Sequence, residues 1–146
     1  MTIREVPCSE EILRELIALS GDWAAENSCR GYRKNTAADI EGNRIFVAQE
    51  DGIIGYLFGR RSVTKEHSSV CPAETDCFEI EELYVRPEFR SRGIGQALFR
   101  HVEEQLSGQV SFLMLSTATK NFRAILHFYI DELGLEFWSA RLYKKL

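Results

Sequence analysis

The chain has 146 residues, of which 45% are hydrophobic, and it carries a formal net charge of −4. This length predicts one domain, residues 1–146, with a core large enough to fold without disulfides or a structural metal. The negative charge argues against nucleic acid as a partner. No apolar run approaches the roughly 20 residues that cross a bilayer, so we expect no membrane partner either.

The N-terminal sequence and the cysteines favour a cytoplasmic protein. Residues 1–11 lack the basic and then apolar pattern of a secretory signal peptide. Reduced thiols are the expectation for the four cysteines, which are Cys8, Cys29, Cys71 and Cys77. His67 lies close in sequence to Cys71 and Cys77, but the three form no C-x-x-C pair and have no evident fourth ligand, so we expect no metal.

The first forty residues predict a strand and two helices. Residues 2–6 alternate as a short strand does, and Ser9 can cap a helix that runs to about Ala25. Residues 37–41 predict a second, short helix. The apolar side chains of the first helix recur at helical spacing, at Ile12, Leu13, Leu16 and Ile17.

Three strands are predicted next. Residues 44–49 and 53–60 are rich in β-formers and are joined by Asp51-Gly52, a strong signal for a tight hairpin. Residues 65–76 are polar and predict a loop. The third strand covers residues 78–85 and ends before Pro87, because proline cannot donate to a strand ladder.

The second half alternates helices and strands. We expect a helix over residues 93–107, a buried strand over 110–116, a helix over 121–133 with Phe122 and Tyr129 facing inward, and a last strand over 136–143. The whole pattern predicts an α/β (α+β) fold with at least one parallel strand pair.

The segment from Phe78 to Leu98 has the chemistry of an anion site. A strand ends, a basic turn follows, and glycines open a helix whose first N–H groups lack intrahelical partners. Gly93 and Gly95 let a ligand approach the backbone, while Arg90 and Arg92 supply positive charge. The run is no P-loop, and Leu98 stands where a dinucleotide fingerprint needs glycine, so we read a pyrophosphate cradle.

Two runs in this sequence resemble motifs of the GNAT superfamily of N-acetyltransferases. Arg90-Ser91-Arg92-Gly93-Ile94-Gly95 matches R/Q-x-x-G-x-G/A, and Val85-Arg86-Pro87 before it is also similar to that family. Later, Asn121-Phe122-Arg123-Ala124, Phe128-Tyr129 and Gly134-Leu135 resemble N-x-x-A…F-Y…G-F, with Leu135 where phenylalanine is commoner. The resemblance covers about residues 40–146.

The resemblance implies a mixed, mostly antiparallel central sheet flanked by helices and splayed between the fourth and fifth strands, with acetyl-CoA in the split. Asn121 would then lie beside the pantetheine arm and Tyr129 near the thioester sulfur. The backbone of Leu83, Tyr84 and Val85 would pair with pantetheine, and the pyrophosphate would be held by Arg90 and by the N–H groups of Ser91, Arg92, Gly93, Ile94, Gly95 and Gln96.

Amine acetylation needs a base, because an alkyl amine with a pKa of about 10.4 is protonated at neutral pH. Glu79, Glu81 and Glu82 are the candidates. Strand alternation puts Glu79 and Glu81 on one face and Glu82 on the other, unless a bulge disturbs it. In the family a glutamate at such a position acts through water, and we favour Glu81, then Glu79. Tyr129 would protonate the leaving thiolate.

The sequence leaves the acceptor open. Asp22, Trp23 and Glu26 are hypotheses for its pocket, and the loop at 65–77 is a hypothesis for a lid. The leading acceptor is a small amine: a polyamine, an aminoglycoside or an amino-acid-like metabolite. A protein lysine or N-terminus is the alternative, as is a catalytically silent acyl-CoA-binding module. A homodimer is possible, since edge strands invite pairing and residues 136–143 are one candidate.

Overall fold

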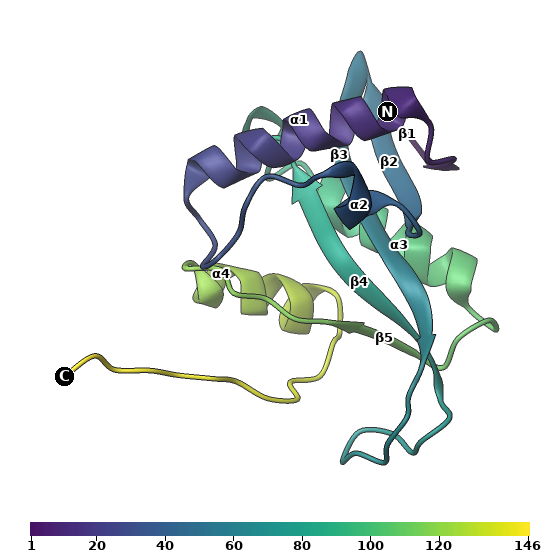
Figure 1. Cartoon of the computed structure of the whole chain (residues 1–146), viewed down its shortest axis with the longest axis vertical. Helices are drawn as coiled ribbons and strands as arrows, with labels where there is room; N and C mark the ends of the chain where they lie inside the picture. The colour runs from purple at the N-terminus through teal and green to yellow at the C-terminus, as the bar shows by residue number, and fades with distance from the viewer.

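A computed structural model describes residues 1–146 and contains one five-stranded sheet in the order β1-β2-β3-β4-β5 (Figure 1). The strands are β1 (Thr2–Val6), β2 (Arg44–Glu50), β3 (Gly52–Val63), β4 (Asp76–Val85) and β5 (Phe112–Leu115). Neighbours pair antiparallel except β4 and β5, which are parallel. The expected mixed sheet is therefore confirmed.

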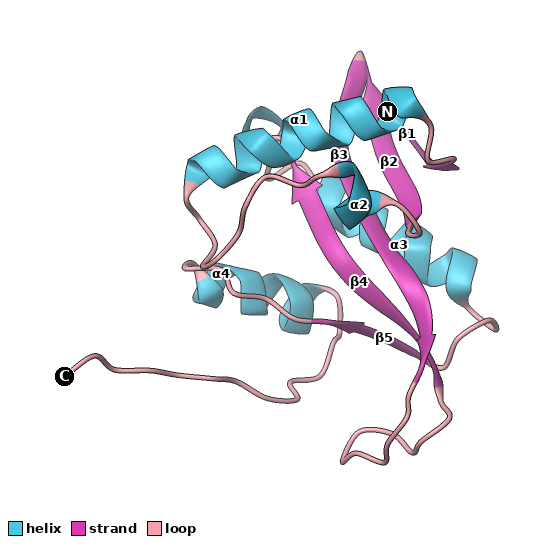
Figure 2. Cartoon of the chain, in the orientation of Figure 1, coloured by secondary structure: helices cyan, strands magenta, loops and turns pink.

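Helices cover both faces of the sheet (Figure 2). They are α1 (Glu10–Glu26), α2 (Ala37–Ile40), α3 (Ile94–Leu106) and α4 (Phe122–Leu126), with a 3₁₀ turn η1 (Pro87–Phe89) and a π turn η2 (His127–Glu132). As expected, Ser9 caps α1, accepting a hydrogen bond from the Ile12 N–H over 3.2 Å. None of the helices is long and apolar enough to cross a lipid bilayer.

Two apolar clusters hold these layers together. On one face, Leu16 and Leu19 of α1 and Ile40 of α2 pack on the sheet around Tyr56. On the other face, five buried side chains of α3 pack against the sheet: Ile94, Leu98, Phe99, Val102 and Leu106. The sheet is thus buried on both sides, which fixes the position of β4 between two helical layers.

A β-bulge interrupts the pairing of β3 with β4. Phe58 lies opposite Glu82 while Gly59 lies opposite Ile80, so Glu81 is the extra residue. Gly59 makes this possible, because a Cβ there would overlap the carbonyl oxygen of Glu79 and approach the Phe78 ring to 2.8 Å. The bulge reverses which face the following residues of β4 occupy.

The fourth and fifth strands separate after a short contact, as the resemblance implied. β5 pairs with Cys77–Ile80 and then ends, which leaves residues 81–85 of β4 without a neighbour on that side. The chain after α1 spans the open end of the split: the Arg30 N–H donates to Ala118 O over 2.9 Å and the Lys120 N–H to Ser28 O over 2.8 Å.

Three local predictions were wrong. β5 is shorter than residues 110–116 and half-buried rather than buried, because it lies at the end of the sheet. Phe122 is 51% exposed, since α4 has no buried side chain. The strand predicted over 136–143 does not form. A strand is stabilised by its neighbours, and this segment runs away from the sheet as an extended loop (Figure 1).

Candidate active site

The split between β4 and β5 opens into a groove of about 880 Å³. β4 and the residues after β5 form its sides, the start of α3 lies at one end, and α4 and η2 close it. Every cofactor-binding residue predicted from the sequence lines this groove except Arg92, whose guanidinium lies over the Phe89 ring, 5.4 Å from its centroid.

A second pocket of about 240 Å³ adjoins the groove. Residues 29–32, which follow α1, form much of its wall, together with residues 116–118 after β5. Trp23, Glu81 and Glu82 line both spaces, so the two meet at the bulge of β4. A ligand in the groove and a ligand in the smaller pocket would therefore touch the same carboxylates.

The turn before α3 has the free donors of an anion site. No N–H group of residues 91–96 donates a hydrogen bond within the protein, and the first helical bond runs from the Ala97 N–H to Gly93 O over 2.9 Å. Ser91 and Gly93 have φ values of 62° and 77°, which turn successive N–H groups inward as in an anion-binding nest. Gly95 lets the Phe128 ring lie close to the start of α3, because a Cβ at position 95 would be only 3.4 Å from Phe128 Cζ.

Arg90 does not supply free charge to this turn. Its guanidinium pairs with both carboxylate oxygens of Glu26 over 2.7 and 2.9 Å, and its Nε donates to Val85 O over 2.8 Å. The Tyr84 ring lies beneath the guanidinium, 5.5 Å away. Arg90 therefore links the end of α1 to the end of β4, and its guanidinium balances the charge of the Glu26 carboxylate.

Three side chains hold the Glu82 carboxylate by hydrogen bonds. The hydroxyls of Tyr32 and Tyr56 each donate to its Oε1 over 2.8 Å, and Asn35 Nδ2 donates to its Oε2 over 2.8 Å. Burial raises the pKa of Glu82 above its ordinary 4.5, against the lowering effect of these three bonds. A carboxyl with a raised pKa is better matched to taking a proton near neutral pH.

The bulge changes the expected arrangement of the three glutamates. Phe78 and Ile80 face α3, so Glu79 between them faces the α1 layer, where Glu82 also lies. Glu81 is the bulged residue, is exposed, and lines both spaces. Glu79 lines neither, and its pKa is raised by burial and by the charge of Glu81. Because of the bulge, Glu79 and Glu82 lie on the same face, so the expectation that strand alternation puts Glu82 opposite Glu79 was wrong.

Tyr129 lines the groove from the π turn that follows α4. The turn is closed by a hydrogen bond from the Leu133 N–H to Phe128 O over 3.1 Å, and the two aromatic rings of Phe128 and Tyr129 meet edge to face at 5.1 Å. Burial, and then the nearby Cys29, raise the pKa of Tyr129 to about 12. Its hydroxyl is therefore protonated at neutral pH and can act as a hydrogen-bond donor.

Two aromatic rings, those of Trp23 and Tyr32, line the smaller pocket. Trp23 packs against Tyr32, with ring centroids 4.3 Å apart, and against Tyr84 at 5.2 Å. Sequence reasoning missed Tyr32, Asn35 and Tyr56, although a glycine inside β3 was a signal for the bulge that gathers them.

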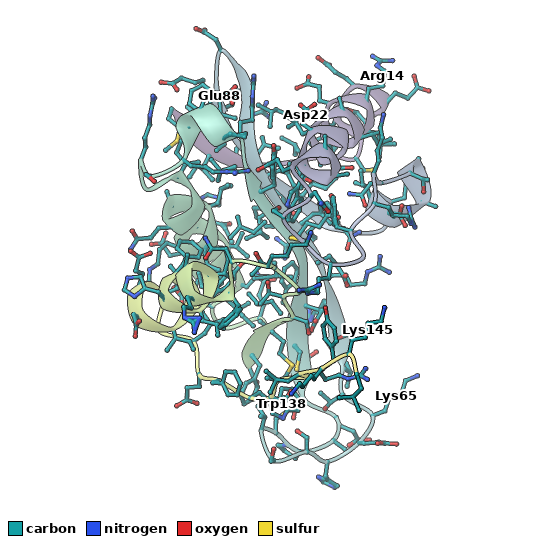
Figure 3. All side chains as sticks on the ribbon, turned by 90° about the vertical axis from the view of Figure 1, so that its left-hand side faces the viewer. Arg14, Asp22, Lys65, Glu88, Trp138 and Lys145 are labelled. Atoms are coloured by element: carbon teal, nitrogen blue, oxygen red, sulfur yellow. The ribbon has the colours of Figure 1, made fainter.

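Three predicted contributors to the acceptor pocket were wrong. Glu26 lines neither space and pairs with Arg90 instead. Asp22 is exposed on α1 and lines neither space. The loop at 65–77 contributes no lining residue, because it precedes β4 and the pockets lie beyond the bulge; Figure 3 shows Lys65 far from Asp22. His67 Nδ1 in this loop accepts the Ala73 N–H over 3.1 Å, and no three metal-binding side chains converge in the structure.

The structure has a mixed sheet that splits beside a glycine-rich helix start, as the resemblance of the two sequence motifs implied. This fold and its groove define the class of protein to which the chain belongs. The model of the acetyltransferase (GNAT) family matches residues 11–135. The chain therefore belongs to this family and is an N-acetyltransferase. No curated protein sequence matches the chain.

Solved structures share the fold at low sequence identity. An aminoglycoside acetyltransferase from an uncultured soil metagenomic sample is 20% identical, with a TM-score of 0.69 over 99% of this chain and 97% of that one. The ribosomal-protein-alanine N-acetyltransferase of Brucella melitensis biovar Abortus 2308 is 16% identical, with a TM-score of 0.69 over 99% and 100%. An acetyltransferase of Trypanosoma brucei is 18% identical, with a TM-score of 0.67 over 99% of each chain.

Proposed function

We propose that the protein transfers the acetyl group of acetyl-CoA to the amine of a small cationic molecule, in a ternary complex. One observation carries the proposal: a groove with free backbone donors meets a second, acidic and aromatic pocket at Glu81 and Glu82. A thioester in the groove and an amine in the pocket would then be brought together at a carboxylate.

In this proposal the groove binds the co-substrate through the backbone. The free N–H groups of residues 91–96 and the dipole of α3 hold the pyrophosphate. The exposed edge of β4 at residues 83–85 pairs with the pantetheine arm, and Asn121 lies at the opposite wall. Because Arg90 is already paired with Glu26, its role in this proposal is to stabilise the wall of the groove rather than to bind phosphate.

The acceptor pocket suits an organic ammonium ion. Glu82 supplies negative charge, and the rings of Trp23 and Tyr32, which line the pocket, attract cations. Aminoglycosides are acceptors of one protein with this fold, and they carry amines of this kind.

The chemistry follows from Glu82. Its carboxylate takes a proton from the bound ammonium, directly or through water, and the neutral nitrogen attacks the thioester carbonyl carbon. A backbone N–H of the unpaired edge near Tyr84 stabilises the oxyanion. The C–S bond then breaks, and Tyr129 donates a hydrogen bond to the departing thiolate. Full transfer of the Tyr129 proton to the thiolate is unfavourable, because the pKa of Tyr129 is about 12 whereas that of a thiol is about 8.5.

The proposal is tested first by binding. Acetyl-CoA is expected to raise the melting temperature, because it binds only the folded state. Acetyl-pantetheine, which lacks the pyrophosphate and the phosphorylated adenosine of acetyl-CoA, is expected to raise it far less, since the donors of residues 91–96 then have no partner. Equal shifts with both compounds, or no shift, would contradict the assignment of the groove.

A further inference from the structure

Two polar side chains lie in the interior of the protein, behind the smaller pocket. Apart from tyrosines and cysteines, Ser20 and Asn35 are the only polar or charged residues that are buried: Ser20 is fully buried and Asn35 is 8% exposed. They bond to each other, since the Asn35 N–H donates to Ser20 Oγ over 2.7 Å. Burying polar groups costs free energy that an apolar pair would not, so this pair needs an explanation other than packing.

Asn35 reaches Glu82 from the segment that joins α1 to α2. This segment passes beside β4 (Figure 1), and Asn35 Nδ2 donates to Glu82 Oε2 over 2.8 Å. Asn35 is held on both sides. Ser20 of α1 fixes its backbone, and the next residue, Thr36, starts the capping box of α2. The direction in which the amide points is therefore set by two helices.

The two oxygens of the Glu82 carboxylate differ in how many acceptor positions remain free. Each oxygen of an ionised carboxylate can accept two hydrogen bonds. Oε1 accepts two, from the hydroxyls of Tyr32 and Tyr56, whereas Oε2 accepts one, from Asn35. The protein therefore leaves one acceptor position open, on Oε2, and Glu82 lines both the groove and the smaller pocket.

The tyrosine hydroxyls alone do not fix this open position. Both bond to Oε1, so they leave Oε2 free to move as the side chain turns. Asn35 bonds to Oε2 and thereby fixes the plane of the carboxylate. Asn35 itself lines neither the groove nor the smaller pocket. It therefore acts on a bound ligand only through Glu82.

We propose that Asn35, anchored by Ser20, is a positioning residue of the transfer reaction: it aims Glu82 Oε2 at the bound amine, and this oxygen takes the proton. One N–H bond of the ammonium ion breaks, its electron pair stays on the nitrogen, and an O–H bond forms on Oε2. The inference rests on the function proposed above, because it assigns one atom to the base step of that reaction.

The groups that act on the charge of Glu82 come from three parts of the chain. Burial, and then the charge of Glu82, raise the pKa of both Tyr32 and Tyr56, so both hydroxyls stay protonated and keep donating. For Glu82, burial raises the pKa, the bond from Asn35 lowers it, and the charge of Asp39 on α2 raises it. The other charged residues that line the smaller pocket are Arg30 and Glu81. Loss of the Asn35 bond is therefore expected to raise the pKa of Glu82 further.

Titration of Glu82 in the free protein tests the inference without any substrate. The side-chain carboxyl carbons are followed by NMR, and the Glu82 signal is assigned by its loss in Glu82→Gln. Asn35→Leu keeps the approximate volume of the side chain and removes the donor. The Glu82 titration is then expected to move to higher pH by about one pH unit, because a hydrogen bond to the ionised form is lost.

Asn43→Leu is the matched control for this titration. Asn43 is also half-buried beside α2, but its amide donates to Ile40 O over 2.9 Å at the opposite end of that helix. The change removes the same kind of donor without touching Glu82, so the Glu82 titration is expected to stay where it is in wild type.

Two further variants keep the test decisive if Asn35→Leu is unstable. Asn35→Asp preserves the shape of the side chain but places a second carboxyl beside Oε2. The two carboxyls are then expected to titrate as a pair, with one step above the wild-type value. Ser20→Ala removes the anchor of the Asn35 backbone and is expected to move the Glu82 titration in the same direction as Asn35→Leu. A Glu82 titration that these variants leave unaltered would overturn the inference.

The kinetic readout is the pH profile of kcat/KM with an acceptor amine. In Asn35→Leu the acid limb is expected to move to higher pH together with the Glu82 titration. On the plateau kcat is expected to fall by about tenfold to a hundredfold, because Oε2 is no longer held in line with the amine. The KM for acetyl-CoA is expected to stay unchanged, because the backbone of residues 91–96 binds the co-substrate.

The two readouts separate this inference from the proposed function. A loss of activity with an unaltered pH profile would make Asn35 a purely structural residue and overturn the inference. A Glu82 titration that moves as expected, in a protein that acetylates no amine, would confirm that Asn35 orients Glu82 and contradict only the proposed function.

Discussion

The hydroxyl of Tyr56 donates a hydrogen bond to Glu82 Oε1 over 2.8 Å, and this bond joins the middle of β3 to the bulge of β4. Tyr56 is fully buried, so its position is fixed by the core. The contact places a carboxylate with a raised pKa at the meeting point of the groove and the smaller pocket. The account of catalysis depends on this one carboxylate.

Glu82→Gln is expected to lower kcat by about a hundredfold to ten-thousandfold, the usual contribution of a general base. The wild-type rate should fall on the acid side as Glu82 is protonated, at a pH above the ordinary 4.5, and the variant should lose that limb. The measurement is kcat/KM against pH.

Glu81→Gln and Glu79→Gln are the matched controls, because they change neighbouring carboxylates of the same strand. A small effect of Glu82→Gln with a large effect of Glu81→Gln would move the base to Glu81, as the sequence alone favoured.

Glu82 also predicts a pH dependence of stability. Its folded-state pKa lies above the unfolded value of 4.5, so the folded state holds the proton more tightly. The resulting stabilisation is present at low pH and is lost as the pH rises from 4.5 through the raised pKa. The free energy of unfolding of wild type minus that of Glu82→Gln should therefore decrease across this window in urea titrations. A difference that is constant or increases would contradict the raised pKa.

Gly59→Ala is expected to destabilise the protein by roughly 1–3 kcal/mol, since the added methyl group overlaps the Glu79 carbonyl and the Phe78 ring. It should also lower kcat, because a shift of the bulge moves Glu82. Gly21→Ala in α1 is the control: its Cβ meets only the flexible Lys34 side chain, at 3.2 Å. Equal unfolding free energies for the two variants would show that the bulge does not need glycine.

Tyr129→Phe is expected to lower kcat by about 10- to 150-fold, the equivalent of a hydrogen bond to a charged group at roughly 1.5–3 kcal/mol. The Kd for acetyl-CoA should change little, because the backbone holds the co-substrate. The loss of kcat should be smaller with an acetyl thioester whose thiol is more acidic, because its thiolate needs less stabilisation as it leaves. If turnover is unchanged and the melting temperature falls, Tyr129 is a packing residue.

Local patterns in the sequence predicted most of the fold and the turn before α3. The Asp51-Gly52 hairpin and the Ser9 cap depend on neighbouring residues, and they formed as expected. The surroundings of Glu82 could not be predicted, because Tyr32, Asn35 and Tyr56 come from three separate segments and meet through the bulge.

Long-range pairing accounts for the other differences. Residues 136–143 have a strand-type sequence, but they pair with no strand of the sheet, although β5 pairs with β4 along one side only. Arg90 has the position of a phosphate ligand in its motif, yet two of its N–H groups donate to Glu26, 64 residues away in the sequence.

The most direct test of the central claim is acetyl transfer itself. The protein is incubated with acetyl-CoA and a panel of polyamines, aminoglycosides and amino acids, and Glu82→Gln is treated in the same way. The release of free thiol is followed, and the masses of the products are measured by mass spectrometry. The account predicts thiol release with at least one cationic amine, an acetylated product in equal amount, and strong loss of both in the variant. Thiol release that is independent of every amine, or none with any of them, would contradict it.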